Sequence, residues 1–242
     1  MNPPKSYPED ANYAIYKLPE SLSAWLARKL VAINIEAIRS SPKRVLPYTA
    51  EYMKDTEHWL SQLKDPRRTV WICVAPNAKT GSTSLEEGHW VGMIRLWGPL
   101  SLQEYYDFTT SGEKGISNDS GTRWRIGRLF IAKSHRSVGL LDSLFMAVLD
   151  FVEKASTELG RPDHNGACGS NPVRFQMQGC AYYNSIMHRF HEANGAKVIA
   201  HLTEVQTFGF DQVLNGVPQD LLSEDDHSKP AAVLFEFTQK RT

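Results

Sequence analysis

The sequence predicts a mixed α/β fold, because segments with strand character alternate with segments of helical periodicity along the chain. Strand character shows where β-branched and aromatic residues gather, as in Thr69–Ala75 and Arg125–Ala132. Helical character shows where apolar residues recur every three or four positions, as they do from Leu141 onward. The 242 residues, 41% of them apolar, can build a sizeable core. We therefore expect one α/β domain over residues 1–242.

The N-terminal part of the chain is predicted to contain a strand and two helices. Tyr13–Leu18 has the short apolar alternation of a strand. Ser21 is placed to cap a helix whose apolar residues continue at helical spacing to Ile35. Thr49 opens a second helical pattern, which Pro66 stops because proline cannot continue a helix.

Two strands and a long loop are expected next. Thr69–Ala75 and His89–Leu96 are joined by a turn rich in Gly, Ser and Thr, so we expect them to form a hairpin. Between residues 101 and 121 the sequence becomes polar and rich in glycine, which is typical of an exposed loop. This loop is longer than most connections in compact domains.

Strands and helices continue to alternate in the C-terminal half. The strand Arg125–Ala132 is followed by a basic loop and by a helix whose apolar residues reach Val152. The strand Val173–Met177 precedes a helical pattern over Tyr182–Ala193. Two more strands are predicted, over Lys197–Val205 and Ala231–Thr238.

Charge and cysteine content argue against several classes of function. Twenty-seven Lys and Arg balance twenty-seven Asp and Glu, so no global charge favours nucleic acid or an anionic membrane. The three cysteines, Cys73, Cys168 and Cys180, lack the paired spacing of zinc sites and the density of disulfide scaffolds. We see no secretion signal, and no apolar stretch approaches the roughly 18 residues that span a bilayer. We expect a cytoplasmic protein, with a nuclear location also open.

The segment Lys133–Leu141 lies where a strand leads into a helix, and it has features of an anion site. The first backbone amides of a helix have no intrahelical partner, and the helix dipole favours negative charge near them. Gly139 permits close approach of the backbone, and His135 and Arg136 join Lys133 in supplying positive charge or donors. These features suit a diphosphate, but a glycine at a turn beside a solvated basic surface would look the same. The phosphate-loop patterns of NTP-binding and dinucleotide-binding proteins are not found.

The run from the end of this strand into the helix reads Ile131-Ala132-Lys133-Ser134-His135-Arg136-Ser137-Val138-Gly139-Leu140-Leu141. It resembles the acetyl-CoA signature of the Gcn5-related N-acetyltransferases, the GNAT superfamily. In that signature Arg or Gln, two residues, Gly, one residue and Gly or Ala follow the fourth strand. Arg136 and Gly139 match the signature, whereas Leu141 stands where the family prefers a small residue.

A second stretch, NSIMHRFHEANGAK, begins at Asn184 and resembles the fourth helix of the same family. In relatives an Asn near the start of this helix helps to hold the pantetheine arm of the cofactor, and Asn184 stands in that place. Phe190, Glu192 and Gly195 also correspond in position. His191 occupies the position at which Tyr is common in the family.

The resemblance implies a GNAT-like fold, in which helices flank a mostly antiparallel sheet of about six to seven strands. Two parallel strands, one ending at Ala132 and one starting near Val173, would splay apart to admit pantetheine. The pyrophosphate would rest on the amides of the loop, and acetyl-CoA would be the cosubstrate. The residues that would bind it are Ile131, Ala132, Lys133, Arg136, Ser137, Val138, Gly139, Leu140, Leu141 and Asn184.

Acetyl transfer needs a base for the protonated amine and an acid for the departing thiolate. His191 is our candidate for the acid, because imidazole can donate a proton near neutral pH. The carboxylate that protein-acetylating relatives often carry on the fourth strand would fall near Trp124 or Arg125, and neither is a carboxylate. The base is therefore left open among Tyr183, Glu104, Asp107, Glu86 and water.

The sequence thus predicts an N-acetyltransferase that moves acetyl from acetyl-CoA to a primary amine in a ternary complex. Zero net charge favours a small-molecule acceptor over a basic histone-like tail. Acetylation of protein N-termini or lysines is the alternative within the enzyme class. A non-catalytic CoA-binding or interaction module with the same fold is the other alternative, which Leu141 and the missing carboxylate support. We expect a monomer or homodimer without a metal, a nucleic-acid partner or a membrane partner.

Three other constellations have less support. His188 and His191 are one helical turn apart, but no third ligand is indicated that would complete a metal site. Cys180 follows a strand, where a small buried thiol is a simpler interpretation than a nucleophile. Four aromatic residues could line an acceptor pocket, although core packing explains them better. These are Trp90, Trp97, Tyr105 and Trp124.

Overall fold

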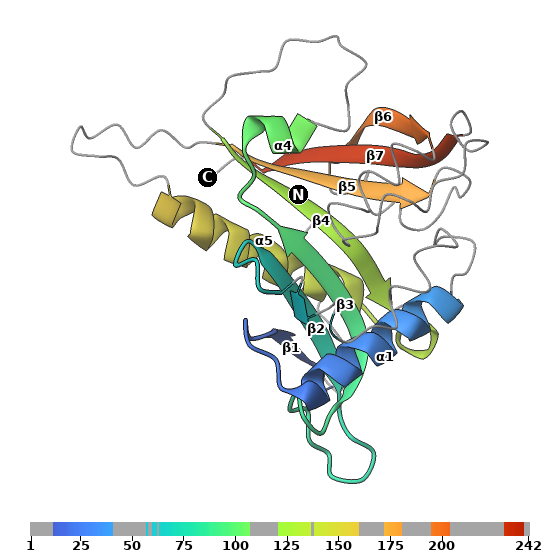
Figure 1. The fold of residues 1–242 in the computed structure, drawn as a ribbon. Helices are drawn as coiled ribbons and strands as arrows, with labels where there is room; N and C mark the ends of the chain where they lie inside the picture. The colour runs from blue at the N-terminus through green and yellow to red at the C-terminus, as the bar shows by residue number, and fades with distance from the viewer. Residues whose placement is uncertain are drawn as a thin grey trace. The chain divides into compact units, whose positions relative to one another are not determined.

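The computed structural model of the protein describes residues 12–40, 57, 60–61, 63–106, 121–136, 138–159, 172–180, 195–203 and 230–239. Strands and helices alternate along these ranges (Figure 1). No helix within them has both the length and the apolar character needed to cross a membrane. The elements are β1 (Ala14–Lys17), α1 (Ala24–Ser40), β2 (Arg68–Ala75), β3 (His89–Trp97), α4 (Leu102–Tyr106), β4 (Thr122–Ile131), the 3₁₀ helix η2 (Lys133–His135), α5 (Leu140–Leu159), β5 (Val173–Cys180), β6 (Lys197–Thr203) and β7 (Pro230–Gln239).

The seven strands are hydrogen-bonded in the order β1-β2-β3-β4-β5-β7-β6. β1 is antiparallel to β2, and β7 is antiparallel to both β5 and β6, whereas β4 and β5 are parallel. The strand nearest the C-terminus, β7, is therefore inserted between β5 and β6. The predicted mixed α/β fold with a mostly antiparallel sheet and one parallel pair is confirmed.

The chain divides into two compact units. Unit 1 contains Met1–Arg95 and Arg128–Leu149, and unit 2 contains Leu96–Gly127 and Asp150–Thr242. β3, β4 and α5 each contribute residues to both units. The loop after β4 and the start of α5 belong to unit 1, whereas the part of β4 that pairs with β5 belongs to unit 2.

In unit 1, the helix α1 begins after Ser23. The Leu26 amide donates to Ser23 Oγ at 3.3 Å, and the Ala27 amide donates to the Ser23 carbonyl at 3.0 Å. Ser23 is therefore the N-cap, and the predicted cap at Ser21 is wrong by two residues. Both serines have suitable chemistry. The cap at Ser23 is the one that accompanies a helix with Leu26 and Leu30 buried in the core.

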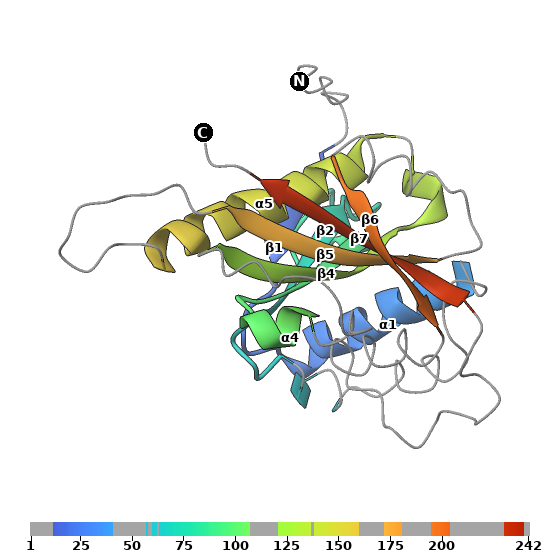
Figure 2. The same ribbon diagram turned by 90° about the horizontal axis from the view of Figure 1, so that it is seen from above.

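The core of unit 1 forms around β2 and β3. α1 and the first half of α5 lie on opposite faces of these strands (Figures 1 and 2). Both strands are buried along most of their length, which explains why their sequences are almost continuously apolar. β4 approaches β3 closely at Gly92, since a Cβ there would lie 2.5 Å from Ile131 Cδ1. Glycine is required at this crossing because a larger residue would displace Ile131.

In unit 2, β4 and β5 form a parallel ladder of five residue pairs, from Thr122 to Ile126 on β4. The last pair joins Ile126 to Met177. β4 nevertheless continues to Ile131 and β5 to Cys180, and β5 stays paired with β7 along its whole length. The parallel ladder between these two strands therefore ends before either strand does.

The helix α4 replaces the start of the loop that the sequence predicts over residues 101–121. The Glu104 amide donates to Ser101 Oγ at 3.2 Å, and the Ser101 amide donates to the Glu104 carboxylate at 2.8 Å, which makes a capping box. Tyr105 is fully buried, so this segment packs and is not an exposed loop. Residues 107–120 lie outside the described ranges. The apolar partners of Tyr105 are Trp97, Leu100, Leu202 and Leu234.

The second half of α5 covers the other face of the unit 2 strands. The rings of Trp124 and Phe151 meet edge to face with centroids 6.3 Å apart, and Thr122 Oγ1 lies 2.7 Å from Ser156 Oγ. Figure 2 shows α4 and α5 on opposite sides of β4 and β5. Successive side chains of a strand point to opposite faces. Trp124 therefore faces α5, and Arg125 faces α4.

Candidate functional site

The first part of the candidate site is the end of β4 in unit 1. The Ala132 amide donates to the Val91 carbonyl of β3 at 2.7 Å. Backbone groups of successive strand residues point to opposite edges, so the amide and carbonyl of Ile131 point away from β3. Ile131 and Ala132 are both buried. Of these two predicted cofactor-binding residues, Ala132 thus has its amide engaged within the sheet, and Ile131 faces the other edge.

Arg136 folds back onto the end of β4. Its Nε donates to the Ile131 carbonyl at 2.9 Å, and its amide lies 3.5 Å from the Lys133 carbonyl at the end of η2. The side chain is otherwise exposed. The structure therefore brings Arg136 and Ile131, two predicted cofactor-binding residues, into direct contact. The same hydrogen bond occupies the Ile131 carbonyl, which leaves the Ile131 amide as the backbone group of this residue that can pair with a ligand.

Gly139 sets the start of α5. Its φ is 77°, in the left-handed region that favours glycine. Its carbonyl accepts hydrogen bonds from the amide of Ser143 at 3.1 Å and from Ser143 Oγ at 3.3 Å. α5 then continues for 20 residues from Leu140. The amides before Ser143 have no intrahelical acceptor because of helix geometry, so they are available to an anion.

The charges near the start of α5 favour an anion. Lys133 and Arg136 are exposed, and so is Asp142 in the first helical turn. His135, the third predicted basic residue, is engaged elsewhere, because its Nδ1 lies 3.0 Å from the Tyr13 hydroxyl. The two rings meet edge to face, with centroids 5.8 Å apart. Two exposed cations against one carboxylate leave a local excess of positive charge.

β4 changes its geometry shortly after the parallel ladder ends. Arg128 has a φ of 39°, which is uncommon for a residue other than glycine. The residues on both sides of it, Gly127 and Leu129, are half-buried, whereas β4 is buried before and after them. A residue with positive φ breaks the regular alternation of a strand and redirects its backbone groups. The sheet pattern of β4 is therefore interrupted in the middle of the strand.

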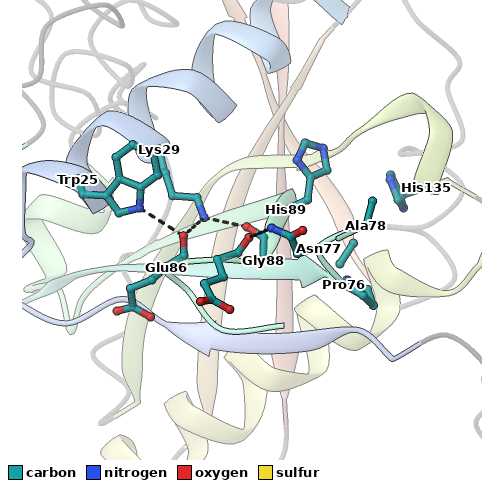
Figure 3. Close-up of a pocket in the computed structure, with 11 residues that line it drawn as sticks. Trp25, Lys29, Pro76, Asn77, Ala78, Glu86, Gly88, His89 and His135 are labelled. Carbon is teal, nitrogen blue, oxygen red and sulfur yellow. Dashed lines mark hydrogen bonds between the residues drawn. The ribbon is translucent and has the colours of Figure 1, made fainter. Parts of the chain in front are cut away.

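A pocket of about 520 Å³ opens in unit 1 between α1, the connection from β2 to β3, and η2 (Figure 3). His89 and His135 line one side, with ring centroids 6.4 Å apart. Trp25 and Lys29 of α1 line the other side. Within the described ranges, no group of three or more His, Cys, Asp or Glu side chains is arranged to hold a metal ion.

Lys29 makes three hydrogen bonds at this pocket. Its Nζ donates to the carbonyls of Leu85 at 2.8 Å, Glu86 at 3.0 Å and Gly88 at 2.7 Å. Trp25 Nε1 donates to the same Glu86 carbonyl at 3.2 Å. Partial burial lowers the pKa of Lys29, and the Glu86 carboxylate opposes that effect. Figure 3 shows these bonds linking α1 to the β2–β3 connection, so the Lys29 side chain holds two elements together.

Two of the residues named as possible bases, Glu86 of unit 1 and Glu104 of unit 2, lie in the described part of the chain. Glu104 caps α4 through its carboxylate. Glu86 offers its backbone carbonyl to Lys29 and Trp25, and its carboxylate points away from His89 in Figure 3. The remaining two residues, Tyr183 and Asp107, lie outside the described ranges.

The aromatic residues considered for an acceptor pocket belong to the core. Each is at most 5% exposed. Their burial follows from the apolar strands that carry them and from the packing of α4 and α5 on those strands. These residues are Trp90, Trp97, Tyr105 and Trp124.

The sequence analysis missed a row of polar side chains on the α4 face of unit 2. Arg125, Gln176 and Glu236 are neighbours across β4, β5 and β7. Arg125 is fully buried, and its Nη2 donates to the carbonyls of Glu104 at 2.6 Å and Tyr105 at 2.8 Å. Its Nε donates to Gln176 Oε1 at 3.2 Å. Arg125 thus ties α4 to both parallel strands.

Glu236 links the same row to α4 and to β5. Tyr105 donates its hydroxyl hydrogen to Glu236 Oε2 at 3.0 Å, and Arg174 Nη1 lies 3.3 Å from Glu236 Oε1. Burial, and then the Glu236 carboxylate, raise the pKa of Tyr105 well above its ordinary value. A signal for the row exists in the sequence. Polar residues alternate with apolar ones in RWR on β4, RFQMQ on β5 and FEF on β7.

Several predicted site residues lie outside the described part of the chain. These are Ser137 of the loop, Asn184 and the proposed acid His191. The same holds for His188 and for the side chain of Cys180. Their predicted roles stay predictions from the sequence.

Comparison with known proteins finds solved structures that are similar to this one. Sequence comparison matches no family model and no curated protein. NAA60 from Arabidopsis thaliana, solved with a bisubstrate analogue, has a TM-score of 0.54 and 13% identity, over 94% of this chain and 100% of that chain. The PaiA N-acetyltransferase from Thermoplasma acidophilum, solved with coenzyme A, has a TM-score of 0.51 and 11% identity, over 94% and 99%.

An acetyltransferase from Streptococcus agalactiae is similar to the same degree, with a TM-score of 0.50 and 14% identity over 93% of this chain and 96% of that chain. At such identities the likeness concerns the fold. All three comparisons span nearly the whole chain. The protein has the fold of the Gcn5-related N-acetyltransferases, as the motifs in its sequence predict.

Proposed function

We propose that the protein is an N-acetyltransferase that transfers the acetyl group of acetyl-CoA directly to a primary amine. The observation that carries this proposal is the junction of β4 and α5. There Gly139, with its left-handed φ, opens a 20-residue helix beside the exposed cations Lys133 and Arg136. Unpaired helical amides together with local positive charge suit a diphosphate. The fold shared with PaiA, solved with coenzyme A, supports the same assignment.

The residues present fit the proposed cofactor. The pyrophosphate would lie on the backbone amides from Val138 to Leu141, with Arg136 and Lys133 beside it. The amide of Ile131, which points away from β3, would donate to the pantetheine arm. The remaining predicted cofactor-binding residues, Ala132, Ser137 and Asn184, keep that role on the resemblance of the sequence.

The proposed chemistry needs two proton transfers. Bound acetyl-CoA supplies an activated acetyl group and a thiolate leaving group. We propose that His191 protonates the thiolate, since imidazole is a proton donor near neutral pH. Trp124 and Arg125 stand where some relatives carry a carboxylate, and neither can accept a proton from an ammonium. Loss of the amine proton to water fits these residues best.

A small-molecule amine is our first choice of acceptor, because the chain carries no net charge that would attract a basic protein tail. Acetylation of protein N-termini or lysines is the second choice. NAA60 was solved with a bisubstrate analogue and PaiA with coenzyme A. Their identities to this chain, 13% and 11%, do not select between the acceptors.

Release of free thiol from acetyl-CoA, measured over a panel of small amines and peptides, tests the proposal. We expect acetylated product to form in proportion to thiol release for at least one class of amine. Mass spectrometry of the product would identify the acetylated nitrogen. Binding of CoA without turnover above background on every amine and peptide would refute the enzyme hypothesis and favour a CoA-binding module.

The proposed acid is tested by His191→Ala. General acid catalysis contributes a factor of about 10²–10⁴, so we expect kcat to fall by roughly 100-fold or more while the Kd for CoA stays nearly the same. His201→Ala is the matched control, because His201 is an exposed histidine on β6. An unchanged kcat in His191→Ala would remove His191 from the reaction. A loss of CoA affinity equal to the loss of kcat would make it a binding residue.

A further inference from the structure

A tyrosine from the N-terminal part of unit 1 contacts the loop between β4 and α5. The hydroxyl of Tyr13 lies 3.0 Å from Nδ1 of His135, which is 122 residues away in the sequence. The two rings meet edge to face, with centroids 5.8 Å apart, and both side chains are half-buried. The hydrogen bond also fixes the orientation of the imidazole, because a flipped ring would turn a carbon toward the hydroxyl. Tyr13 therefore holds His135 in one position.

Tyr13 is itself held by the sheet. It directly precedes Ala14, the first residue of β1, which pairs with Val74 of β2. All four residues of β1 are paired with β2, and β2 is buried along most of its length. Backbone that is hydrogen-bonded to a buried strand opens rarely. The hydroxyl of Tyr13 is therefore presented to the loop from a fixed place.

The loop depends on its side chains for its position. η2 is a single turn of 3₁₀ helix, and no side chain caps its start at Ala132. The amide of His135 donates to the Ala132 carbonyl at 2.9 Å, and Arg136 Nε bonds to the Ile131 carbonyl. A turn this short is only weakly stabilised by its own backbone. The bond between His135 and Tyr13 adds a link from this turn to the segment before β1.

His135 lies close in sequence to the amides that are proposed to hold the pyrophosphate. Val138, the first of them, follows His135 by three residues, and three residues span at most about 11 Å. The ring of His89 lies next to His135, with centroids 6.4 Å apart (Figure 3). Backbone amides bind an anion best when they are already oriented before the anion arrives. A fixed η2 therefore favours a fixed set of amides at the start of α5.

We propose that Tyr13 is a positioning residue of the cofactor site, which acts through His135 to hold the amides from Val138 to Leu141 in place for the diphosphate of CoA. The inference rests on the proposed acetyltransferase function, because it takes the loop to be the site of this cofactor. The role of Tyr13 is to orient His135, and it involves no proton transfer. All of these residues belong to unit 1.

Tyr13→Phe keeps the ring and removes the hydroxyl. We expect it to raise the Kd for CoA by roughly 2-fold to 10-fold, measured by calorimetry, because one intramolecular hydrogen bond contributes about that factor. The KM for acetyl-CoA should rise with the Kd. The value of kcat at saturating acetyl-CoA should stay the same, because the acetyl group is at the opposite end of the cofactor from the diphosphate.

A shorter acetyl donor separates positioning of the loop from a general loss of structure. S-Acetylpantetheine carries the same thioester as acetyl-CoA but lacks the diphosphate and the nucleotide. Its kcat/KM should therefore be equal in Tyr13→Phe and in the wild type. If Tyr13 only stabilised the fold, its loss would lower kcat/KM for both donors alike.

Tyr16→Phe is the matched control, because Tyr16 is a half-buried tyrosine on β1 whose hydroxyl has no hydrogen-bond partner in the part of the chain that the structure describes. It should leave the Kd for CoA unchanged. His135→Leu should weaken CoA binding, and Tyr13→Phe should weaken it no further in the double variant, because both changes remove the same bond. His135→Asn should restore much of the affinity, since its amide can bond to the Tyr13 hydroxyl.

An unchanged Kd for CoA in Tyr13→Phe would overturn the inference, as would equal losses of kcat/KM with both donors. Losses of affinity that add fully in the double variant would also overturn it. The proposed function fails in a different way. If the wild type does not bind CoA, the phosphate loop is wrongly assigned and the inference falls with it, whereas CoA binding that is indifferent to Tyr13→Phe overturns this inference alone.

Discussion

At the scale of single residues, the anion site depends on the backbone of Gly139. Its φ of 77° directs the chain into α5. A residue with a Cβ in this conformation costs roughly 1–2 kcal/mol more than glycine. That strain would shift the amides that open the helix, which are the groups proposed to hold the pyrophosphate.

We therefore expect Gly139→Val to raise the Kd for CoA by roughly 10-fold or more, as measured by calorimetry. Gly81→Val is the matched control, because Gly81 has a similar φ of 69° and open space around the position of a Cβ. It should lower the free energy of unfolding by a comparable 1–2 kcal/mol or so without changing CoA affinity. Equal affinities in Gly139→Val and the wild type would show that the phosphate loop is wrongly assigned.

Arg125 is a residue whose contacts could not be predicted from its position in the sequence. Spacing places Arg125 where relatives often carry a carboxylate, and it predicts nothing about what the guanidinium contacts. In the structure Arg125 bonds to two backbone carbonyls of α4 and to Gln176. Arg125 therefore supplies no base, and it holds the side-chain amide of Gln176 in place.

At the scale of elements, α1 is joined to the β2–β3 connection by Lys29. One ammonium group satisfies the carbonyls of Leu85, Glu86 and Gly88, and it lies 5.3 Å from the centroid of the Trp90 ring. The connection is 13 residues long, from residue 76 to residue 88. A loop of this length depends on such contacts for its order, because its own backbone supplies few hydrogen bonds.

Lys29→Met should lower the free energy of unfolding by about 1–3 kcal/mol, since it removes the donor for three carbonyls. Urea denaturation measures this change. Arg28→Met provides the control, because Arg28 is the neighbouring exposed cation on α1 and its replacement should change stability by less than about 0.5 kcal/mol. Equal effects of the two substitutions would mean that the Lys29 bonds add nothing to stability.

Sequence periodicity predicts the elements well and their ends less well. All seven strands occur where alternation and β-branched residues predict them, with ends that differ by up to a few residues. The short helix α4 was expected to be loop, although its capping box, Ser101 with Glu104, is visible in the sequence. The polar residues that follow obscured it, because one turn of helix is too short to show periodicity.

At the scale of the whole molecule, the buried thiol of Cys73 reports on opening of the core of unit 1. Cys73 is fully buried on β2, and burial raises its pKa to about 12. The thiolate is the reactive form, and at pH 8 a group with this pKa is ionised to only about one part in 10⁴. Reaction of Cys73 therefore requires the surrounding core to open.

We expect maleimide labelling of the Cys73 peptide at pH 8 to be slower in the folded protein than in urea by a factor that tracks global stability. Mass spectrometry of the Cys73 peptide distinguishes it from Cys168 and Cys180. The raised pKa also means that above its ordinary value of 9.0 the unfolded state binds fewer protons than the folded state. Stability should therefore fall as pH rises from about 9 toward 12. Rapid labelling of folded protein at pH 8 would contradict this picture.

The features that the sequence was sufficient to predict are those encoded locally. The loop from Lys133 to Leu141 is one continuous segment, so the strand, the glycine, the basic residues and the helix could be recognised together, and the structure shows their junction. The mostly antiparallel sheet with one parallel pair followed from the resemblance of two such segments to one family, whereas the order of the strands in the sheet came from the structure. Capping residues and hydrophobic periodicity form patterns over a few neighbouring residues, so they can be recognised in the sequence before the fold is known.

The polar row on the α4 face needed the folded chain. Arg125 and Gln176 are 51 residues apart, and Tyr105 and Glu236 are 131 apart. Strand pairing brings them together, and pairing partners at such distances are not encoded in the spacing of residues along the chain. Their polar character was visible, but the hydrogen bonds between them became visible only in the folded chain, where burial removes the water that would otherwise satisfy them.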